Sequence, residues 1–308
     1  MKKTVLLGIY CLLFIHFIYG QNTPVTSKDN LPKVSDEVYN AIAQFYEYDK
    51  NVPLNAVIAH KKKNKTSVIE KIVFTGPYNS RVPSYLIIPK KSLDKYPIVL
   101  IADGIYGSKD RWFEEKSWPK GKQLIDALLN EGIAVMLLDA VYHGERAADY
   151  DYKKPPWLLS QPYEGIKMVS QTAIEYRRAM DYLSTRPEIN ISKIGMLGLS
   201  MGGIIAYQVM ALDERIETVV IGVAPSLKDY PKLQPIAPTT FASRSKVRSF
   251  MNFMGTKDGL YTIPEAKMLF NRVPTTNKTF IEFNAGHEPP IDYIEMAKNW
   301  FVKTLNEE

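Results

Sequence analysis

Residues 193–206 read KIGMLGLSMGGIIA, an apolar strand pattern that changes into a helix pattern at Ser200. Gly198, Ser200 and Gly202 form a G-x-S-x-G motif at this junction. In a sharp strand-to-helix turn, small flanking residues leave the serine hydroxyl exposed, and the N–H of the next residue, Met201, lies at a helix N-terminus. The motif therefore predicts a nucleophilic Ser200. The competing interpretation is a turn that only needs small residues.

The chain on both sides of this stretch alternates between short apolar runs and amphipathic segments. Continuous apolar strands that are each followed by a helix predict an α/β fold with a mostly parallel central sheet and helices on both faces. Residues 57–89 are strand-like and predict antiparallel strands at one edge of the sheet. The predicted strands are 96–104, 133–140, 193–198, 216–224, 249–255 and 278–284, and the predicted helices are 120–132, 169–183, 201–212, 264–273 and 294–305.

The 308 residues suit one large α/β domain better than two small ones. We expect a signal peptide over residues 1–20, an N-terminal segment with a short helix over 21–50, and the catalytic domain over 51–308. The short helix is predicted at Val34–Tyr48, with Val34, Val38, Ala41 and Phe45 on one face. Residues 144–165 and 225–244 lack a core pattern and are expected to be loop insertions over the site.

The first twenty residues have the pattern of a secretory signal peptide. Lys2 and Lys3 precede the apolar run VLLGIYCLLFIHFIYG, which ends at the small residue Gly20. The expected location is therefore secreted or periplasmic, with an N-terminal membrane anchor as the alternative. After cleavage we expect no stable membrane insertion.

Composition and charge exclude several functions. The only cysteine, Cys11, lies in the predicted signal peptide, so the mature chain would have no thiol nucleophile, disulfide or cysteine-bound metal. The net charge of +6 is concentrated only in the run His60–Lys65, which is expected to be a solvated hairpin turn rather than a nucleic-acid or membrane patch. There is no HExxH motif, no carboxylate–histidine cluster at ligand spacing and no G-x-G-x-x-G, so we expect no metal and no cofactor.

A serine nucleophile needs a base and an acid to orient that base. In this architecture the chain order is serine, then aspartate or glutamate, then histidine. Of the four histidines, only His287 follows Ser200, so His287 is the predicted base. Asp258 follows a predicted strand in GTKDG and is the predicted acid, with Asp229 as the second candidate.

Acyl transfer also needs donors for the oxyanion of the tetrahedral intermediate. The glycine-flanked loop after the strand YPIVLIA reads Asp103-Gly104-Ile105-Tyr106-Gly107. We expect the backbone N–H groups of Ile105 and Met201 to form the oxyanion hole. A carboxylate at Asp103 would oppose this role unless it is paired or points away.

With these motifs the chain resembles the α/β-hydrolase superfamily, in the branch of dienelactone hydrolases, acetyl xylan esterases and prolyl-oligopeptidase-like catalytic domains. The matching runs include RVPSYLIIP, PIVLIADGIYG, LLDAVYHGERA, the stretch from YRRAMDYL to GLSMGG, GTKDG and NAGHEPP, from about Lys71 to the C-terminus. The resemblance implies the same roles for Ser200, Asp258 and His287, and a loop histidine, His143, that is not catalytic. Two departures are Asp103-Gly104 where the family often has His-Gly, and serine where true dienelactone hydrolases have a cysteine nucleophile.

These features predict a secreted serine esterase that forms an acyl-enzyme and takes small-molecule or carbohydrate esters. An aminoacyl or peptide amide hydrolase with the same triad is the alternative, followed by a catalytically silent binding protein on this scaffold. The oligomeric state is not predicted. The aromatic candidates for lining a substrate pocket, with packing on the edge of the sheet as the equal alternative, are Tyr106, Trp112, Trp157, Tyr163 and, in the later loop, Tyr230.

Overall fold

The computed structural model describes residues 29–148 and 157–306, and it has the predicted α/β architecture with a mostly parallel central sheet. The predicted signal peptide, residues 21–28 and part of the predicted loop 144–165 lie outside the described residues. No helix in the described ranges is both long and apolar enough to cross a membrane.

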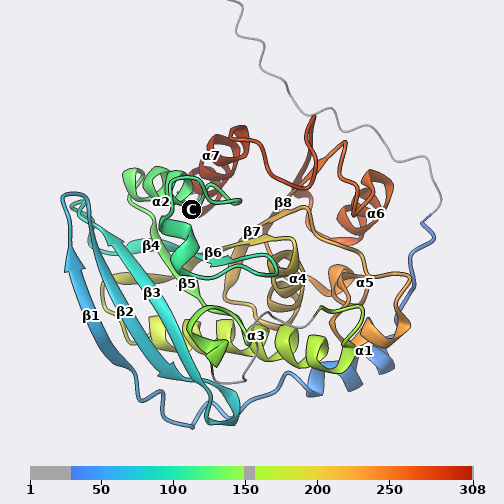
Figure 1. Ribbon diagram of the computed structural model, residues 1–308, viewed down its shortest axis with the longest axis horizontal. Coiled ribbons are helices and arrows are strands. Elements are labelled where there is room, and N and C mark those ends of the chain that lie inside the picture. The colour runs from blue at the N-terminus through green and yellow to red at the C-terminus, as the bar shows by residue number, and fades with distance from the viewer. Residues whose placement is uncertain (1–28, 149–156, 307–308) are drawn as a thin grey trace, which may run out of the picture.

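The described chain forms one nine-stranded sheet in the order β1-β2-β3-β5-β4-β6-β7-β8-β9 (Figure 1). The strands from β5 to β9 in this order are parallel, and β1, β2 and β3 join them as an antiparallel edge. The strand bounds are β1 Val57–Lys63, β2 Ser67–Thr75, β3 Arg81–Pro89, β4 Tyr96–Ala102, β5 Ala134–Leu138, β6 Ile189–Leu199, β7 Ile216–Gly222, β8 Ser249–Gly255 and β9 Asn277–Phe283.

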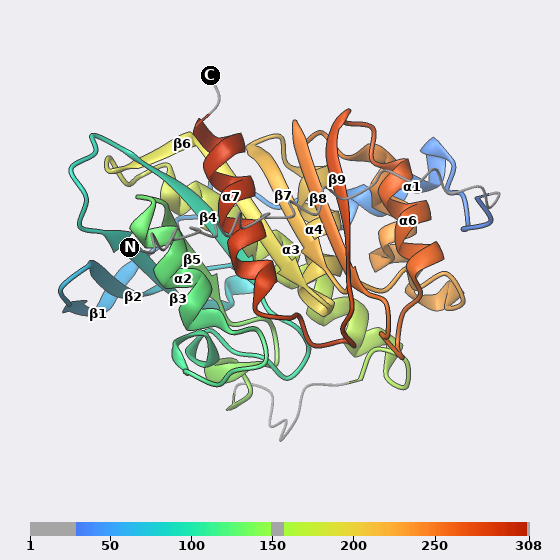
Figure 2. The same ribbon diagram turned by 90° about the horizontal axis from the view of Figure 1, so that it is seen from above.

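Helices cover both faces of the sheet, as expected for parallel strands that are apolar on both sides. In Figure 2, α2 and α7 lie on one face, and α3 and α4 lie on the other. Along β4 the side chains alternate between two core clusters, with Leu100 on the α3–α4 face and Val99 and Ile101 on the α2–α7 face. The helix bounds are α1 Asp36–Gln44, α2 Gly121–Asn130, α3 Pro162–Leu183, α4 Met201–Leu212, α5 Pro238–Phe241, α6 Ile263–Arg272 and α7 Asp292–Asn306.

The N-terminal helix α1 is shorter than predicted and packs through a different face. Ser35 caps it, with its Oγ accepting a hydrogen bond from the Val38 N–H at 3.3 Å. The predicted face is wrong within the helix, because Val38 and Ala41 are exposed, as is Phe45 directly after it; of the four predicted residues only Val34, before the helix, is buried. Tyr39 of α1 and Tyr46, two residues after the helix, both meet the Phe241 ring edge-on, at 6.0 and 5.6 Å, so contacts with the distant α5 set the side of this segment that packs.

The segment 225–244 is a packed layer rather than an open loop insertion. It contains three short helical turns: η5 Pro231–Ile236, α5, and η6 Ala242–Arg244. Leu233, Ile236 and Phe241 are buried, and the Ile236 carbonyl accepts a hydrogen bond from Gln208 of α4 at 3.0 Å. Helix α3 also begins earlier than predicted, with Pro162 in its first turn.

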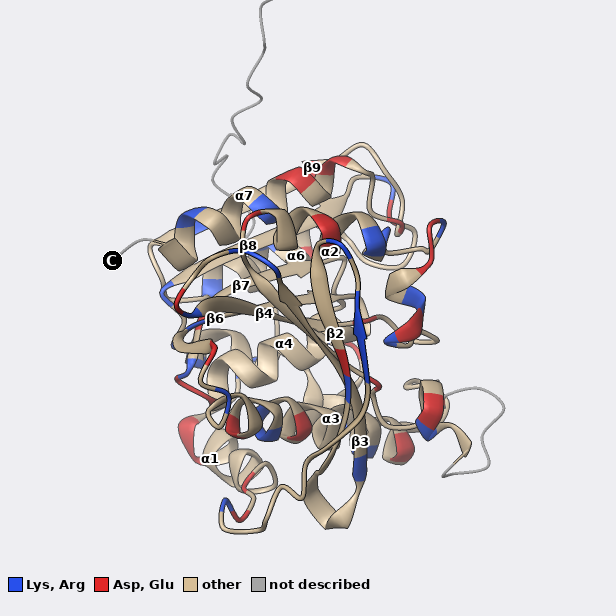
Figure 3. Cartoon of the chain, turned by 90° about the vertical axis from the view of Figure 1, so that its left-hand side faces the viewer, with Lys and Arg blue, Asp and Glu red and all other residues tan. Residues whose placement is uncertain are grey.

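The basic run 60–65 lies mostly in the edge strand β1 and continues into the hairpin turn. Every residue of β1 is exposed, and Figure 3 looks onto this edge. Asn64 forms the turn, because its Oδ1 accepts a hydrogen bond from the Ser67 N–H at 2.6 Å. Lysines on an edge strand oppose pairing with further strands, which gives this charge a structural role.

Candidate active site

Ser200 is the residue between β6 and α4, at the carboxyl end of the parallel sheet. Its backbone has φ 54° and ψ −115°, a conformation that L-residues rarely adopt. Two backbone hydrogen bonds hold it there, from Ser200 N–H to the Gly222 carbonyl at 2.9 Å and from Gly203 N–H to the Ser200 carbonyl at 2.9 Å. Strain of this kind persists only where the surrounding structure fixes it, and it is common at functional sites.

The two glycines of the motif allow backbone segments to approach each other closely. A Cβ on Gly202 would lie 2.0 Å from the Ala102 carbonyl oxygen of β4. A Cβ on Gly198 would lie 2.3 Å from the Gly202 carbonyl oxygen. Small residues are therefore required here by contacts with β4 and within the turn.

We expect Gly202→Ala to destabilise the fold by about 2–3 kcal/mol, because the added methyl group must displace the backbone of β4. Urea unfolding measures this change. Gly259→Ala is the matched control, since its Cβ would meet no atom within 4 Å, and it should change stability by less than about 0.5 kcal/mol. Equal stabilities for the two variants would contradict the close approach.

The structure brings Ser200, His287 and Asp258 together from three separate loops. His287 Nε2 lies 3.1 Å from Ser200 Oγ, and His287 Nδ1 lies 2.9 Å from Asp258 Oδ2. Because a carboxylate accepts, Nδ1 carries the proton and Nε2 is left to accept from the serine hydroxyl. Asp229, the second candidate, is instead 72% exposed and paired with Lys228.

The Asp258 carboxylate is fully buried and is held by several donors. Burial alone would raise its pKa, but the hydrogen bond from His287 and the N–H groups of Leu260 and Tyr261 outweigh burial, so the pKa of Asp258 is lowered. Asp258 is therefore an ionised acceptor beside His287 at neutral pH.

Two aromatic side chains that the sequence analysis did not identify flank His287. The ring centroid of Trp118 lies 5.6 Å from that of the imidazole, and the Tyr261 ring meets it edge-on at 5.4 Å. Burial, followed by the Asp258 charge, raises the pKa of Tyr261 to about 12. Because Tyr261 lies three residues after the predicted acid Asp258, its position near His287 could have been predicted from the sequence. Nothing in the sequence around Trp118 indicated that this residue lies beside His287.

The loop after β4 forms a tight turn beside Ser200. Gly107 N–H donates to the Gly104 carbonyl at 3.0 Å, which leaves Ile105 and Tyr106 at the tip. A Cβ on Gly104 would lie 3.4 Å from the Ser200 Cβ, so this turn borders the serine. Of the predicted donors, Ile105 lies in this turn and Met201 is the first residue of α4, directly after Ser200; their role as an oxyanion hole stays a prediction.

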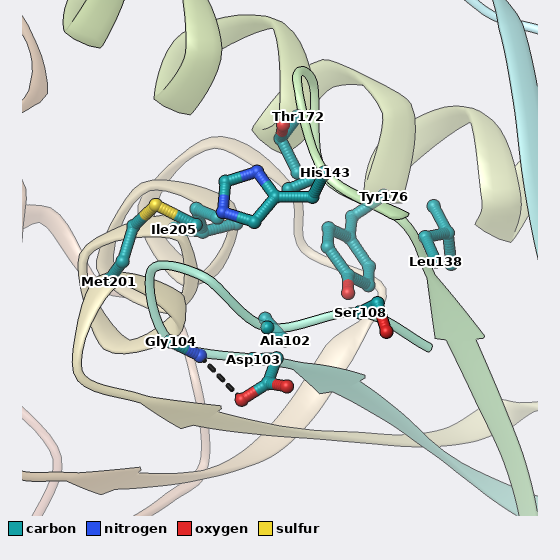
Figure 4. A pocket seen from close by; sticks show the side chains of 12 residues that line it. Ala102, Asp103, Gly104, Ser108, Leu138, His143, Thr172, Tyr176, Met201 and Ile205 are labelled. Atoms are coloured by element: carbon teal, nitrogen blue, oxygen red, sulfur yellow. Dashed lines mark hydrogen bonds between the residues drawn. The ribbon is translucent and has the colours of Figure 1, made fainter. Parts of the chain in front are cut away.

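The Asp103 carboxylate is paired. Arg111 Nη2 lies 2.9 and 3.0 Å from its two oxygens, and the Gly104 N–H donates to Oδ1 at 2.7 Å (Figure 4). Burial raises the pKa of Asp103, although Arg111 opposes this shift. The Asp103 carboxylate is thus bound by groups of its own loop. Because it is paired, it meets the condition under which Asp103 is compatible with an oxyanion hole in this loop.

A group of acidic residues near this loop is occupied by a lysine. Asp110, Asp139 and Glu145 have oxygens close enough to share a cation. The buried Lys109 Nζ binds all three, at 3.2 Å from Asp110, at 2.9 Å from Asp139 and also to Glu145. This ammonium supplies the positive charge that the cluster needs and ties the loop after β4 to the loop after β5.

The predicted pocket residues divide into two groups. Trp112 is 0% exposed and packs in the α2–α7 core, where its ring lies against Gly121, so the prediction that it lines a substrate pocket is wrong. Tyr106 is exposed in the turn beside Ser200. Trp157 and Tyr163 are exposed before and at the start of α3, and their role in a pocket stays a prediction.

His143 lies in the loop after β5 and gives the fold a pH dependence. Burial lowers the pKa of His143 from 6.5 to about 4, so the folded chain keeps it neutral where the unfolded chain binds a proton. We expect stability to fall as the pH drops from about 6.5 to about 4, by about 3 kcal/mol in total, and this contribution to stay constant below that. Urea unfolding at several pH values measures this, and His143→Asn should remove most of that component. If the free energy of unfolding of His143→Asn depended on pH as that of the parent does, His143 would not be the source of this pH dependence.

Comparisons with known proteins identify the family and the fold. The model of the dienelactone hydrolase family matches residues 82–282. Over 174 residues the chain is 25% identical to putative hydrolase YtaP of Bacillus subtilis, which covers 54% of this chain and 56% of that protein. A second relative, uncharacterized protein PA2218 of Pseudomonas aeruginosa, is 25% identical over 175 residues, or 56% of this chain and 39% of that protein. The alignments thus span about half or less of the length of these relatives.

Solved structures show the same fold at low sequence identity. Acetyl xylan esterase 1 from Thermoanaerobacterium has a TM-score of 0.70 and 17% identity, covering 92% of this chain and 96% of that chain. A cold-adapted esterase from an Arctic intertidal metagenomic library has a TM-score of 0.64 and 18% identity, covering 80% of this chain and 98% of that chain.

Proposed function

Because the chain belongs to the dienelactone hydrolase family, we propose that it is a serine hydrolase that cleaves carboxylic esters through Ser200, His287 and Asp258. The observation that carries this proposal is the continuous path of contacts from Ser200 Oγ to His287 Nε2 at 3.1 Å and from His287 Nδ1 to Asp258 Oδ2 at 2.9 Å. This arrangement is the one that a serine hydroxyl needs to lose its proton as it attacks.

In the proposed reaction, Ser200 Oγ attacks the ester carbonyl carbon and His287 Nε2 takes the hydroxyl proton. Asp258 holds Nδ1–H and stabilises the imidazolium that forms. The N–H groups of Met201 and Ile105 stabilise the oxyanion of the tetrahedral intermediate. His287 then protonates the alcohol oxygen as the C–O bond breaks, and a water molecule repeats the sequence on the acyl-enzyme to release the acid.

We further propose acylated carbohydrates as the substrate class. Trp118 and Tyr261 flank His287, which is the side from which the alcohol must leave after protonation. Aromatic faces present a large apolar surface with a polar edge, which suits the alternating apolar and hydroxyl faces of a sugar ring. The acetyl xylan esterases among the structural neighbours are consistent with this choice.

A substrate panel tests the proposal. We expect p-nitrophenyl acetate and acetylated xylo-oligosaccharides to be hydrolysed, and an aminoacyl p-nitroanilide to react at least about 100-fold more slowly. The Ser200→Ala variant serves as the blank for each substrate. Faster amide cleavage would favour the amidase alternative, and no turnover of any substrate would favour the binding protein.

We propose that the protein is secreted after cleavage following Gly20, on the pattern of residues 1–20. Expression of the full chain in a bacterial host should give a mature protein that begins at Gln21, which intact-mass spectrometry detects. Recovery of the uncleaved chain in the membrane fraction would favour the N-terminal anchor instead.

A further inference from the structure

His143 is a buried histidine outside the Ser200–His287–Asp258 set, and its two ring nitrogens have different surroundings. Its side chain is 2% exposed. Nδ1 lies 2.8 Å from the Val141 carbonyl oxygen, which can only accept, so Nδ1 carries a proton. Nε2 is buried and has no hydrogen-bond partner among the described residues.

The ring is neutral, so Nε2 is an acceptor. Burial lowers the pKa of His143 to about 4, and the positive charges of Arg146 and Arg111 add to this effect. With Nδ1 protonated, the lone pair of Nε2 is free to receive a hydrogen bond. A buried acceptor without a donor is costly, and native proteins commonly satisfy such groups with an ordered water.

A small cavity lies beside this ring, between the loop after β4 and the loop after β5 (Figure 4). Its volume of about 10 Å³ is sufficient for about one water molecule. Besides His143, the polar side chains in its lining are Asp103, Ser108, Thr172 and Tyr176, and Gly104 and Gly107 contribute only backbone atoms.

The cavity adjoins the parts of the chain that border Ser200. Gly104 begins the turn that carries Ile105, and Met201 follows the serine directly. On the far side of the same two loops, Asp139 accepts the N–H of Lys109 at 2.9 Å and binds its ammonium. The Lys109–Asp139 contact ties the loop after β4 to the loop after β5 on that side. His143 lies on the cavity side, at the place for a second link between the same two loops.

We propose that His143 Nε2 accepts a hydrogen bond from one buried water molecule, and that this water holds the turn Gly104–Gly107 in place beside Ser200. His143 is thus a positioning residue, since it acts on the oxyanion turn through the water and touches no reacting atom. This inference rests on the proposed function of the turn in binding the oxyanion.

Two amide variants separate the two nitrogens of the ring. His143→Gln places an acceptor near the position of Nε2, whereas His143→Asn places a donor near the position of Nδ1. We expect His143→Asn and His143→Phe to lower kcat for p-nitrophenyl acetate by about tenfold with KM within about twofold, because a displaced oxyanion donor acts on the transition state. We expect His143→Gln to stay within about threefold of the parent kcat. His60→Gln, a change in the exposed strand β1, should leave both constants unchanged.

The proposal would be overturned if His143→Asn had the kcat of the parent and His143→Gln had a lowered kcat. That result would mean that only the Nδ1 contact with the Val141 carbonyl matters. The activity of Ser200→Ala is measured in parallel. If Ser200→Ala keeps the kcat of the parent, the proposed function is refuted. If Ser200→Ala is inactive but His143→Phe has the kcat of the parent, only the water site is refuted. A high-resolution crystal structure of the unmodified protein decides the matter if the variants do not fold. We expect one ordered water within hydrogen-bond distance of His143 Nε2, and a dry cavity would overturn the inference.

Discussion

Replacing Ser200 with alanine is expected to lower kcat for ester hydrolysis by about 10⁶-fold, which is the scale of losing the nucleophile from a serine triad. Without the hydroxyl, His287 has no proton to accept and no acyl-enzyme forms. The fold should remain, because Ala keeps the backbone hydrogen bonds to Gly222 and Gly203. Initial rates with p-nitrophenyl acetate, together with thermal unfolding, measure both effects.

Ser192→Ala is the matched control, because Ser192 lies on the same strand, β6, toward its other end. Its hydroxyl donates to Asn190 Oδ1 at 2.7 Å at the exposed start of the strand. We expect its rate to equal that of the parent. Residual activity of Ser200→Ala within tenfold of the parent would mean that another group carries the reaction.

Replacing Asp258 with asparagine is expected to lower kcat by about 10⁴-fold. The amide of the introduced asparagine can donate to Nδ1, which would favour the tautomer with the proton on Nε2 and leave His287 unable to accept from Ser200. The change removes a buried charge that His287 and the N–H groups of Leu260 and Tyr261 stabilise. Steady-state kinetics measure the loss, and thermal unfolding checks that the variant is folded.

Asp229→Asn is the control for this variant, since Asp229 was the second candidate for the acid and is paired only with Lys228 on the surface. We expect its kcat to change by less than about twofold. A large loss in Asp229→Asn and a small one in Asp258→Asn would reverse the two assignments.

The parts of the fold and site that depend on chain order were predictable from the sequence. Continuous apolar strands alternating with helices indicated the parallel sheet, and the family match supports the fold. The scarcity of histidine left only His287 after Ser200, and the structure places these two residues in contact. Asp258 also lies where a residue after a parallel strand must lie, at the carboxyl edge of the sheet.

The parts that depend on contacts between distant segments were not predictable. Trp112 and Trp118 occur in one loop, but Gly121 of α2 makes room for Trp112 in the core, and Trp118 is left beside His287. In the segment 34–48, two sets of apolar residues at helical spacing compete, and Phe241 contacts the set that contains Tyr39 and Tyr46. The local sequence pattern cannot predict contacts of this kind, because the partner can be distant in the chain. Tyr46 and Phe241, for example, are more than a hundred residues apart.

Covalent labelling with a fluorophosphonate, followed by peptide mapping, tests most directly whether Ser200 is a nucleophile activated by His287. The account predicts a single adduct on Ser200 and a labelling rate that falls by at least about 100-fold in His287→Ala. An adduct on a different residue, or labelling of His287→Ala at the parent rate, would contradict it.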